Sequence, residues 1–132
     1  MTTLKGRSIS RGSAKGEVLL CKDPISFFGD IDPATGICVA PKHAIEEKNI
    51  AGKVLVFPHG KGSTVGSYIV LQLKKNNLAP VAIINISAEP IIAVGAIISK
   101  IPMIDKLEKD PFTFLKDGMK VKIDGEKGTI EF

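Results

Sequence analysis

Aromatic side chains are scarce in this sequence, which has no Trp, one Tyr and an aromatic fraction of 5%. A core without them has to be built mainly from Ile, Val, Leu and Ala, the usual filling of strands that are covered by helices. The length of 132 residues fits one domain, and 44% hydrophobic against 24% charged residues is ordinary for a globular protein. We therefore expect one ordered domain over residues 1–132.

Long hydrophobic runs are missing as well. The longest candidate, residues 90–101, contains Gly95, Ser99 and Lys100 and is shorter than the roughly 18 to 20 residues of a membrane-spanning helix. The N-terminal residues lack the apolar stretch of a signal peptide. These absences lead us to expect a cytoplasmic protein with no membrane partner.

Neither sign of charge is concentrated, because 18 basic and 14 acidic residues are interspersed to give a net charge of +4. A nucleic-acid-binding protein normally gathers its Lys and Arg on one face of a recognisable module. No such module is visible, and we expect no nucleic-acid partner. The mildly basic balance suits an anionic small molecule or an acidic partner chain.

Cysteine is limited to Cys21 and Cys38, both in apolar surroundings. They form neither a Cys-x-x-Cys pair nor any other spacing typical of metal ligands. We interpret both as reduced, buried thiols. A metal or cluster, if the protein uses one, would need ligands from another chain.

The hydrophobic pattern predicts alternating strands and helices in the middle of the chain. The predicted strands are 53–57, 80–86 and 101–104, and the predicted helices are 65–76 and one that opens at Pro90. A β-α-β-α-β order requires parallel strands with right-handed crossovers. The fold class is therefore α/β, with a mixed sheet around this central unit.

Antiparallel elements are expected at both ends of the chain. Strands 6–10 and 16–21 flank a turn and predict a hairpin or a β-corner, and strands 119–124 and 128–132 predict a terminal hairpin. A brief helix is predicted to start at Asp110-Pro111 and to end near Gly118. These flanking hairpins would add a second β layer.

One irregular stretch, residues 23–36, carries two Pro and two Gly and cannot form a regular element. It also holds four apolar side chains that should pack against the core: Ile25, Phe27, Phe28 and Ile31. Irregular loops that are nevertheless anchored often serve function.

The glycine-rich segment (residues 59–67) lies between a buried strand and a helix. In open α/β sheets ligands bind at this edge, outside the carboxyl ends of the strands. Gly60, Gly62 and Gly66 leave backbone amides uncovered near a helix N-terminus, where anions bind. The phosphate-binding P-loop is disfavoured, since Gly62 replaces the Ser or Thr that should follow Gly60-Lys61.

Ser63 allows two interpretations: a helix cap, or a hydroxyl directed at a substrate. A helix dipole contributes at most about 2 kcal/mol, which lowers a pKa by only about 1.5. Ser63 could therefore act as a base only with further positive charge from Lys61 or from an Arg or metal centre of a partner. For the lone histidines His43 and His59, a surface or capping role is favoured over catalysis.

Three segments together resemble one family. Residues 23–36 (DPISFFGDIDPATG), 58–64 (PHGKGST) and 89–97 (EPIIAVGAI) look like the small subunits of aconitase X proteins, and the resemblance covers residues 5–132 in the right order. The sequence departs from the pattern at Asp30, where many relatives have a second Gly. The resemblance implies a single swivelling β/β/α domain.

The resemblance also implies an activity and a partner. It implies a heterodimer with an obligate large subunit that carries a [4Fe-4S] cluster. The implied reaction dehydrates a small phosphorylated hydroxy acid, (R)-5-phosphomevalonate, to trans-anhydromevalonate 5-phosphate in an archaeal mevalonate pathway to isoprenoids.

The site residues follow from the same resemblance. The serine of the Gly-Lys-Gly-Ser motif is the proton acceptor in this family, which maps to Ser63. Further residues are expected to bind the anionic part of the substrate or to line the cleft between the subunits: Gly60, Lys61, Gly62 and Thr64, with Ser26 and Gly29 from the irregular loop.

Three alternatives stay open. The chain could belong to a dehydratase for another hydroxy acid, such as a hydroxyproline. It could be a mobile phosphocarrier domain with His59 phosphorylated, although such carriers usually place the histidine after the glycine-threonine-serine run. It could also be a non-catalytic binding module, which would purify without a partner.

Overall fold

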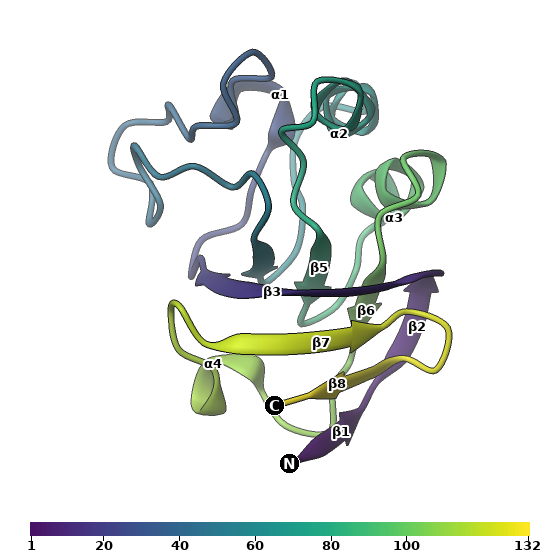
Figure 1. Cartoon of the computed structure of the whole chain (residues 1–132). Coiled ribbons are helices and arrows are strands. Elements are labelled where there is room, and N and C mark those ends of the chain that lie inside the picture. The colour runs from purple at the N-terminus through teal and green to yellow at the C-terminus, as the bar shows by residue number, and fades with distance from the viewer.

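The computed structural model describes residues 1–132, and its centre is a parallel sheet flanked by antiparallel strands (Figure 1). The strand order is β1-β8-β7-β3-β4-β5-β6-β2. The strands are β1 (Thr3–Lys5), β2 (Arg7–Ser10), β3 (Ser13–Leu20), β4 (Val54–Phe57), β5 (Ala82–Asn85), β6 (Met103–Asp105), β7 (Lys120–Asp124) and β8 (Thr129–Glu131). The helices are α1 (Phe27–Asp30), α2 (Gly66–Lys75), α3 (Pro90–Ile98) and α4 (Pro111–Phe114).

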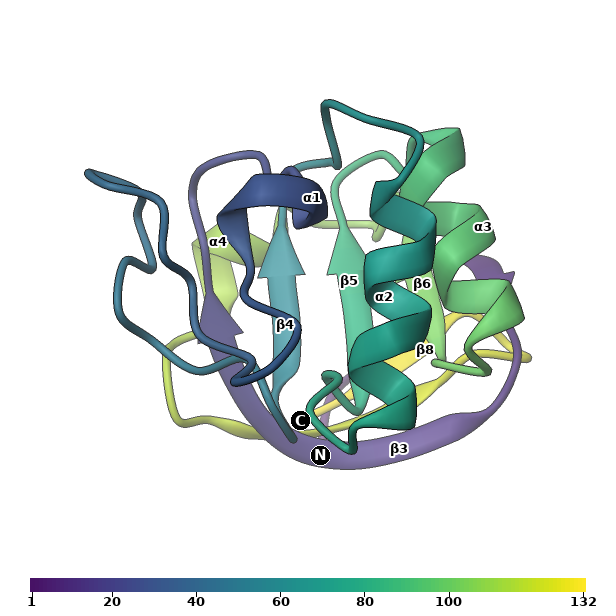
Figure 2. The ribbon, with the colours of Figure 1, turned by 90° about the horizontal axis from the view of Figure 1, so that it is seen from above.

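Strands β3, β4, β5 and β6 pair in parallel, and α2 and α3 lie side by side on one face of them (Figure 2). The chain order β4-α2-β5-α3-β6 confirms the predicted β-α-β-α-β unit. The boundaries of these elements differ from the predicted ones by no more than two residues, as is usual where strand and helix ends fray.

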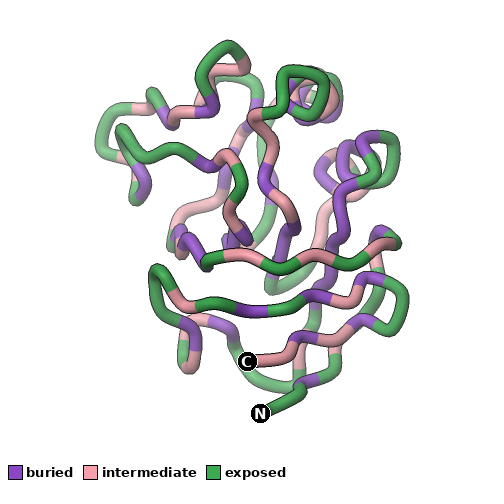
Figure 3. The backbone as a smooth tube through the Cα atoms, viewed as in Figure 1, coloured by how far each residue is buried: buried purple, intermediate pink, exposed green.

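The sheet separates two cores because successive side chains of a strand point to opposite faces. Leu55 and Phe57 of β4 pack on the helix side in a cluster of 17 buried residues, whereas Val54 and Val56 pack on the other side in a cluster of 11. The second cluster is closed by β7, β8, β1 and α4, whose strands alternate buried and exposed positions (Figure 3). The result is a layered β/β/α domain, as predicted.

Strand β3 belongs to both layers. Its first part, from Ser13 to Glu17, pairs antiparallel with β7, and its last part, from Val18 to Leu20, pairs in parallel with β4. Figure 1 shows β3 crossing the molecule between the layers. A single long strand therefore ties the antiparallel layer to the sheet that carries the helices.

The N-terminal hairpin does not form. Strand β2 pairs antiparallel with β6, in a register that places Arg7 opposite Asp105, and not with β3. The turn between β2 and β3 is a β-corner, the second of the two predicted possibilities. Gly12, with φ 112, lies in this turn. The bidentate contact of Arg7 with Asp105, at 2.8 and 2.9 Å, stabilises β2 at the opposite edge of the sheet.

Three smaller differences concern short elements. Strand β1, which pairs with β8, was not predicted because three residues carry too little pattern. Helix α4 begins as predicted, with Asp110 capping the amide of Phe112 at 2.9 Å, but ends at Phe114 and not near Gly118. Within the loop expected to be irregular, α1 is one turn broken by non-helical angles at Phe28 and Gly29.

None of the helices has both the length and the apolar character needed to cross a membrane.

Candidate functional site

Two loops meet at the carboxyl edge of the parallel strands: the irregular loop that follows β3 and the glycine-rich segment that follows β4. Ile25 and Gly60 form a parallel bridge. The amide of Lys61 donates to the carbonyl of Ile25 at 3.0 Å, and the amide of Ile25 donates to the carbonyl of His59 at 3.3 Å. The pairing of β3 with β4 thus continues beyond the strands and brings together the two segments singled out in the sequence.

The glycines of this edge are required by packing. Gly62 has φ 87, and a Cβ atom there would collide with the hydroxyl of Ser26. Gly60 is buried, and a Cβ atom there would collide with Ile92 and with the carboxylate of Glu89. Both positions must lack a side chain for the segment to lie this close to the irregular loop and to α3.

Ser63 is half-buried, and its Oγ accepts a hydrogen bond from the amide of Val65 at 3.1 Å. It is not the helix cap: α2 begins at Gly66, its N-cap is Val65, and no side chain caps it. The carbonyl of Ser63 accepts from the amide of Gly66 at 3.0 Å, in the tight turn that leads into the helix. The hydroxyl therefore lies at the start of α2 without being consumed by a capping bond to the first helical turn.

Three consecutive amides beside this hydroxyl have no partner within the chain. The N–H groups of Gly62, Ser63 and Thr64 donate to no backbone or side-chain acceptor. Gly62 and Thr64 are exposed, so the unpaired donors lie at the surface. Successive free amides in front of a helix N-terminus form a concave site that suits an anion.

The neighbouring helix starts differently. The carboxylate of Glu89 accepts from the amide of Ile92 at 2.7 Å and from that of Ile91 at 3.0 Å, with Pro90 as the first helical residue, as the sequence predicts. The start of α3 is thus occupied by an acid of the chain itself. The start of α2 has no acidic residue in its first turn, and it is the one left open to an external anion.

The other predicted site residues lie around this opening. Lys61 is exposed and takes part in none of the three ion pairs of the chain. Ser26 donates its hydroxyl to the carbonyl of Phe28 at 2.8 Å and lies against Gly62. Gly29 is exposed on the outer turn of the irregular loop, with nothing within 4 Å of where its Cβ would be. The structure thus brings Ser26 to the glycine-rich segment and leaves Gly29 at the rim.

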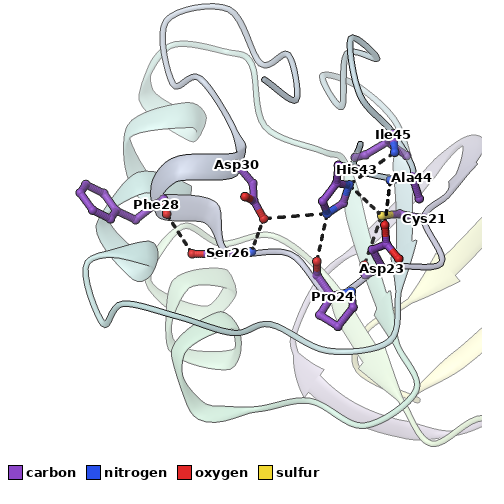
Figure 4. A network of polar contacts seen from close by, with 9 residues as sticks. All are labelled: Cys21, Asp23, Pro24, Ser26, Phe28, Asp30, His43, Ala44 and Ile45. Atoms are coloured by element: carbon purple, nitrogen blue, oxygen red, sulfur yellow. Dashed lines mark hydrogen bonds and ion pairs between the residues drawn. The ribbon is translucent and has the colours of Figure 1, made fainter. Parts of the chain in front are cut away.

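A polar network behind the irregular loop was not foreseen from the sequence (Figure 4). The Nε2 atom of His43 lies 3.0 Å from the carbonyl of Pro24 and 3.8 Å from the carboxylate of Asp30, and that carboxylate accepts from the amide of Ser26 at 2.8 Å. The Nδ1 atom of His43 accepts from the amide of Ile45 at 3.4 Å, so Nε2 carries the proton. His43 and Asp30 therefore hold the loop in which Ser26 lies, a role for which their sequence positions give no signal.

Asn85 was also missed. It ends β5 opposite Phe57, is fully buried, and donates to the carbonyl of Phe57 at 3.0 Å, while its side-chain oxygen has no partner. Buried polar atoms are nearly always paired with protein or water. A polar residue that closes an apolar strand is the signal that could have marked it.

The two cysteines behave as predicted buried thiols. Burial is the main reason why the pKa of Cys21 rises from 9.0 to about 12, and burial also raises the pKa of Cys38. Both remain protonated near neutral pH, and a thiol is a poor metal ligand in that form. No group of three or more His, Cys, Asp or Glu side chains lies close enough together to hold a metal ion.

Comparison with known proteins gives consistent matches. The family model described as aconitase X swivel domain matches residues 3–132. The phosphomevalonate dehydratase small subunit of Methanosarcina mazei is 66% identical over 96% of this chain and 88% of that protein. The crystal structure of the holo form of Thermococcus kodakaraensis aconitase X is 53% identical, covers 99% of this chain and 98% of that one, and superposes with a TM-score of 0.93.

A more distant likeness concerns the fold alone. The crystal structure of 3-isopropylmalate dehydratase from Methanocaldococcus jannaschii superposes with a TM-score of 0.62 at 23% identity, over 91% of this chain and 81% of that one. The layered β/β/α arrangement is thus shared at an identity too low to transfer residue roles.

Proposed function

The chain belongs to the aconitase X swivel-domain family, and we propose that it is the small subunit of a phosphomevalonate dehydratase, with residues 1–132 as one swivelling domain. This hydro-lyase removes water from (R)-5-phosphomevalonate to give trans-anhydromevalonate 5-phosphate, a step toward isoprenoids. The observation that carries the proposal is the set of three unpaired amides beside the Ser63 hydroxyl at the open start of α2. The Methanosarcina mazei relative supports the choice of substrate.

The amides of Gly62, Ser63 and Thr64 bind the carboxylate of the substrate. The proton that is removed comes from the carbon next to that carboxylate, so an acceptor at Ser63 and an anion site on the flanking amides fit the same end of the molecule. The phosphate lies at the other end of the substrate, several bonds away. The exposed Lys61 adds positive charge that favours either anionic group.

Ser63 is the proton acceptor. The C–H bond beside the carboxylate breaks, its electron pair forms the new double bond as the hydroxyl group leaves, and the proton goes to Ser63 Oγ. The hydrogen bond from the Val65 amide at 3.1 Å favours the charged form of that oxygen. The helix dipole adds only about 2 kcal/mol at most, and Ser63 lies before the N-cap, so the partner has to supply further positive charge.

The proposed partner is a large subunit that carries a [4Fe-4S] cluster, in a heterodimer. This chain has no residue set to hold such a cluster, since its two thiols are buried and protonated and no other ligand group is present. When bound by the partner, an iron–sulfur cluster with an open iron supplies a Lewis acid for the leaving hydroxyl. The residues of this chain bind the carboxylate, orient the substrate and take the proton.

Replacement of Ser63 by Ala tests the catalytic assignment in the reconstituted two-subunit enzyme. We expect kcat for phosphomevalonate to fall by about 100-fold to 10,000-fold, the usual contribution of a positioned base, while assembly with the large subunit is retained. Ser87→Ala is the matched control, because Ser87 is an exposed serine at the same edge whose hydroxyl makes no hydrogen bond in the chain.

Two outcomes would overturn the proposal. Wild-type kcat in Ser63→Ala would remove Ser63 from the mechanism. If the same purified complex dehydrates a hydroxyproline but does not dehydrate phosphomevalonate, the enzyme is a dehydratase that acts on a different substrate.

A further inference from the structure

Helix α3 has no polar side chain anywhere along its length, from Pro90 to Ile98. A helix that is apolar on all sides is normally buried on all sides. Only one side of α3 is buried here, through Ile92, Gly95 and Ala96 against α2 and the sheet (Figure 3). The other side is open to solvent.

We define the outer face of α3 as the exposed residues of this helix that recur at helical spacing. Its large members are 48% exposed at Val94, 54% at Ile97 and 45% at Ile98, and Pro90 begins the stripe. Large apolar side chains gathered on one face indicate an interaction site, whereas single exposed ones do not.

The outer face of α3 adjoins the candidate site. Ile91, a half-buried residue of the first turn of α3, has its Cγ2 atom 3.4 Å from the position of a Cβ at Gly66, the first residue of α2. The hydroxyl of Ser67 donates to the carbonyl of Ile91 at 2.6 Å. The starts of α2 and α3 are therefore in contact, and a protein that covers the N-terminal end of α3 lies beside the start of α2.

Four basic residues lie near the C-terminal ends of α2 and α3. Arg11 and Lys100 line a hollow of about 390 Å³ together with Ile97, and Lys74 and Lys75 end α2. None of these four takes part in an ion pair of the chain. The surface is thus an apolar stripe bordered by uncompensated positive charge.

This charge pattern decides between two occupants. A contact between two copies would bring together two chains of net charge +4, each with the same basic border, and like charges across an interface are unfavourable. A different chain with an apolar centre and an acidic border has the complementary chemistry. The proposed enzyme contains a second chain, because relatives of this chain are named as small subunits.

We propose that the outer face of α3, with its basic border, is a docking surface for the large subunit, which meets it with an apolar patch edged by Asp and Glu. This inference rests on the proposed function for the identity of the partner. It predicts only the affinity between the two subunits, which can be measured without an activity assay.

The test is the Kd between the purified large subunit and the full chain, measured by titration calorimetry. The double variant Val94→Glu/Ile97→Glu places acids on the apolar stripe, opposite the apolar patch of the partner, and should raise Kd at least about 30-fold, the effect of a central interface residue. Gln72→Glu is the control for added negative charge, since Gln72 is an exposed polar residue of α2 and one acid is added there outside the apolar stripe; its Kd should stay within about threefold. Circular dichroism and thermal unfolding check that the variants fold.

Arg11→Glu/Lys100→Glu gives a second arm that leaves the apolar stripe intact. It should raise Kd and reduce the dependence of Kd on salt, because the attraction to the acidic border is lost. An unchanged Kd in both double variants would overturn the proposal. Self-association of the free chain that Val94→Glu/Ile97→Glu abolishes, with large-subunit binding intact, would overturn it in favour of a second copy.

The two proposals can fail separately. Ser63→Ala should bind the large subunit with wild-type Kd while lacking turnover. If the complex forms and the α3 variants raise its Kd, but the complex does not dehydrate phosphomevalonate, the docking surface is supported and the proposed substrate is wrong.

Discussion

Helices α2 and α3 lie side by side on one face of the sheet, yet they differ at both their starts and their outer sides (Figure 2). Helix α2 starts without an acidic or capping side chain, and its outer side carries Tyr68, Gln72 and lysines. Helix α3 starts on the carboxylate of Glu89, and its outer side is apolar. Helix α2 therefore has an open start and a polar outer side, whereas α3 has an occupied start and an apolar outer side.

The difference assigns different tasks to the two helices. An open helix start with free amides attracts an external anion, whereas a start filled by a carboxylate repels one. A polar outer side is satisfied by water, whereas an apolar patch on an outer side is typical of an interaction site. On this view α2 presents the substrate site and α3 presents the subunit contact.

Of the changes to the two helix starts, the larger effect is expected from giving α2 the acid that α3 has. Val65→Asp should raise KM for phosphomevalonate by about 100-fold, because the new carboxylate would lie a few ångströms from the bound anion, where like charges repel by about 1 to 4 kcal/mol. The same charge should stabilise the free chain by about 0.5 kcal/mol through the helix dipole. Steady-state kinetics and urea unfolding measure the two effects.

Val65→Asn is the control for that experiment, since it has the shape of Asp without the charge. It should leave KM within a few-fold of wild type. Equal KM values for the Asp and Asn variants would show that no anion binds at the start of α2.

A smaller effect is expected from removing the acid that α3 already has. Glu89→Ala leaves the amides of Ile91 and Ile92 without their acceptor and should lower the free energy of unfolding by about 1 kcal/mol, the usual cost of a lost cap. Glu89→Gln, which keeps an acceptor oxygen, should lose less. Urea unfolding of both variants is the measurement, and equal stability of Glu89→Ala and wild type would contradict the assigned cap.

The smallest effect concerns the side of α3 that faces solvent in the free chain. Val94→Gln should change the free energy of unfolding by no more than about 0.5 kcal/mol, as surface changes usually do. Ile92→Ala, on the buried side of the same helix, should cost about 2 to 5 kcal/mol. Similar costs for the two variants would mean that the outer face is packed within the chain, against the docking proposal.

Much of the fold could be predicted because its central strands are short, apolar and separated by clear helical patterns. The β-α-β-α-β order of residues 53–104 is enough to predict a parallel sheet. The pairing of β2 could not be predicted, since Arg7 finds Asp105 across 98 positions of sequence and a local turn signal suggested a nearer partner. The partner of β2 is set by the overall strand order and not by local sequence preference.

The candidate site was predictable to a similar depth. The two loops were identified by composition, and their meeting at Ser26 and Gly62 follows from parallel strands whose carboxyl ends share an edge. The free amides around Ser63 could not be foreseen, because which donors stay unpaired depends on the turn that the backbone takes before Gly66. The role of His43 depends on Pro24 and Asp30, which only the folded loop brings within 4 Å of it.

The central claim is that the amides at the open start of α2 hold the carboxylate of the substrate beside Ser63. The most direct measurement is a crystal structure of the Ser63→Ala chain with its large subunit and phosphomevalonate bound. We expect a carboxylate oxygen at about 2.7 to 3.2 Å from the amide nitrogens of Gly62, residue 63 or Thr64, the usual range for such hydrogen bonds. Substrate bound with both its anionic groups on other residues, and water on these amides, would contradict the account.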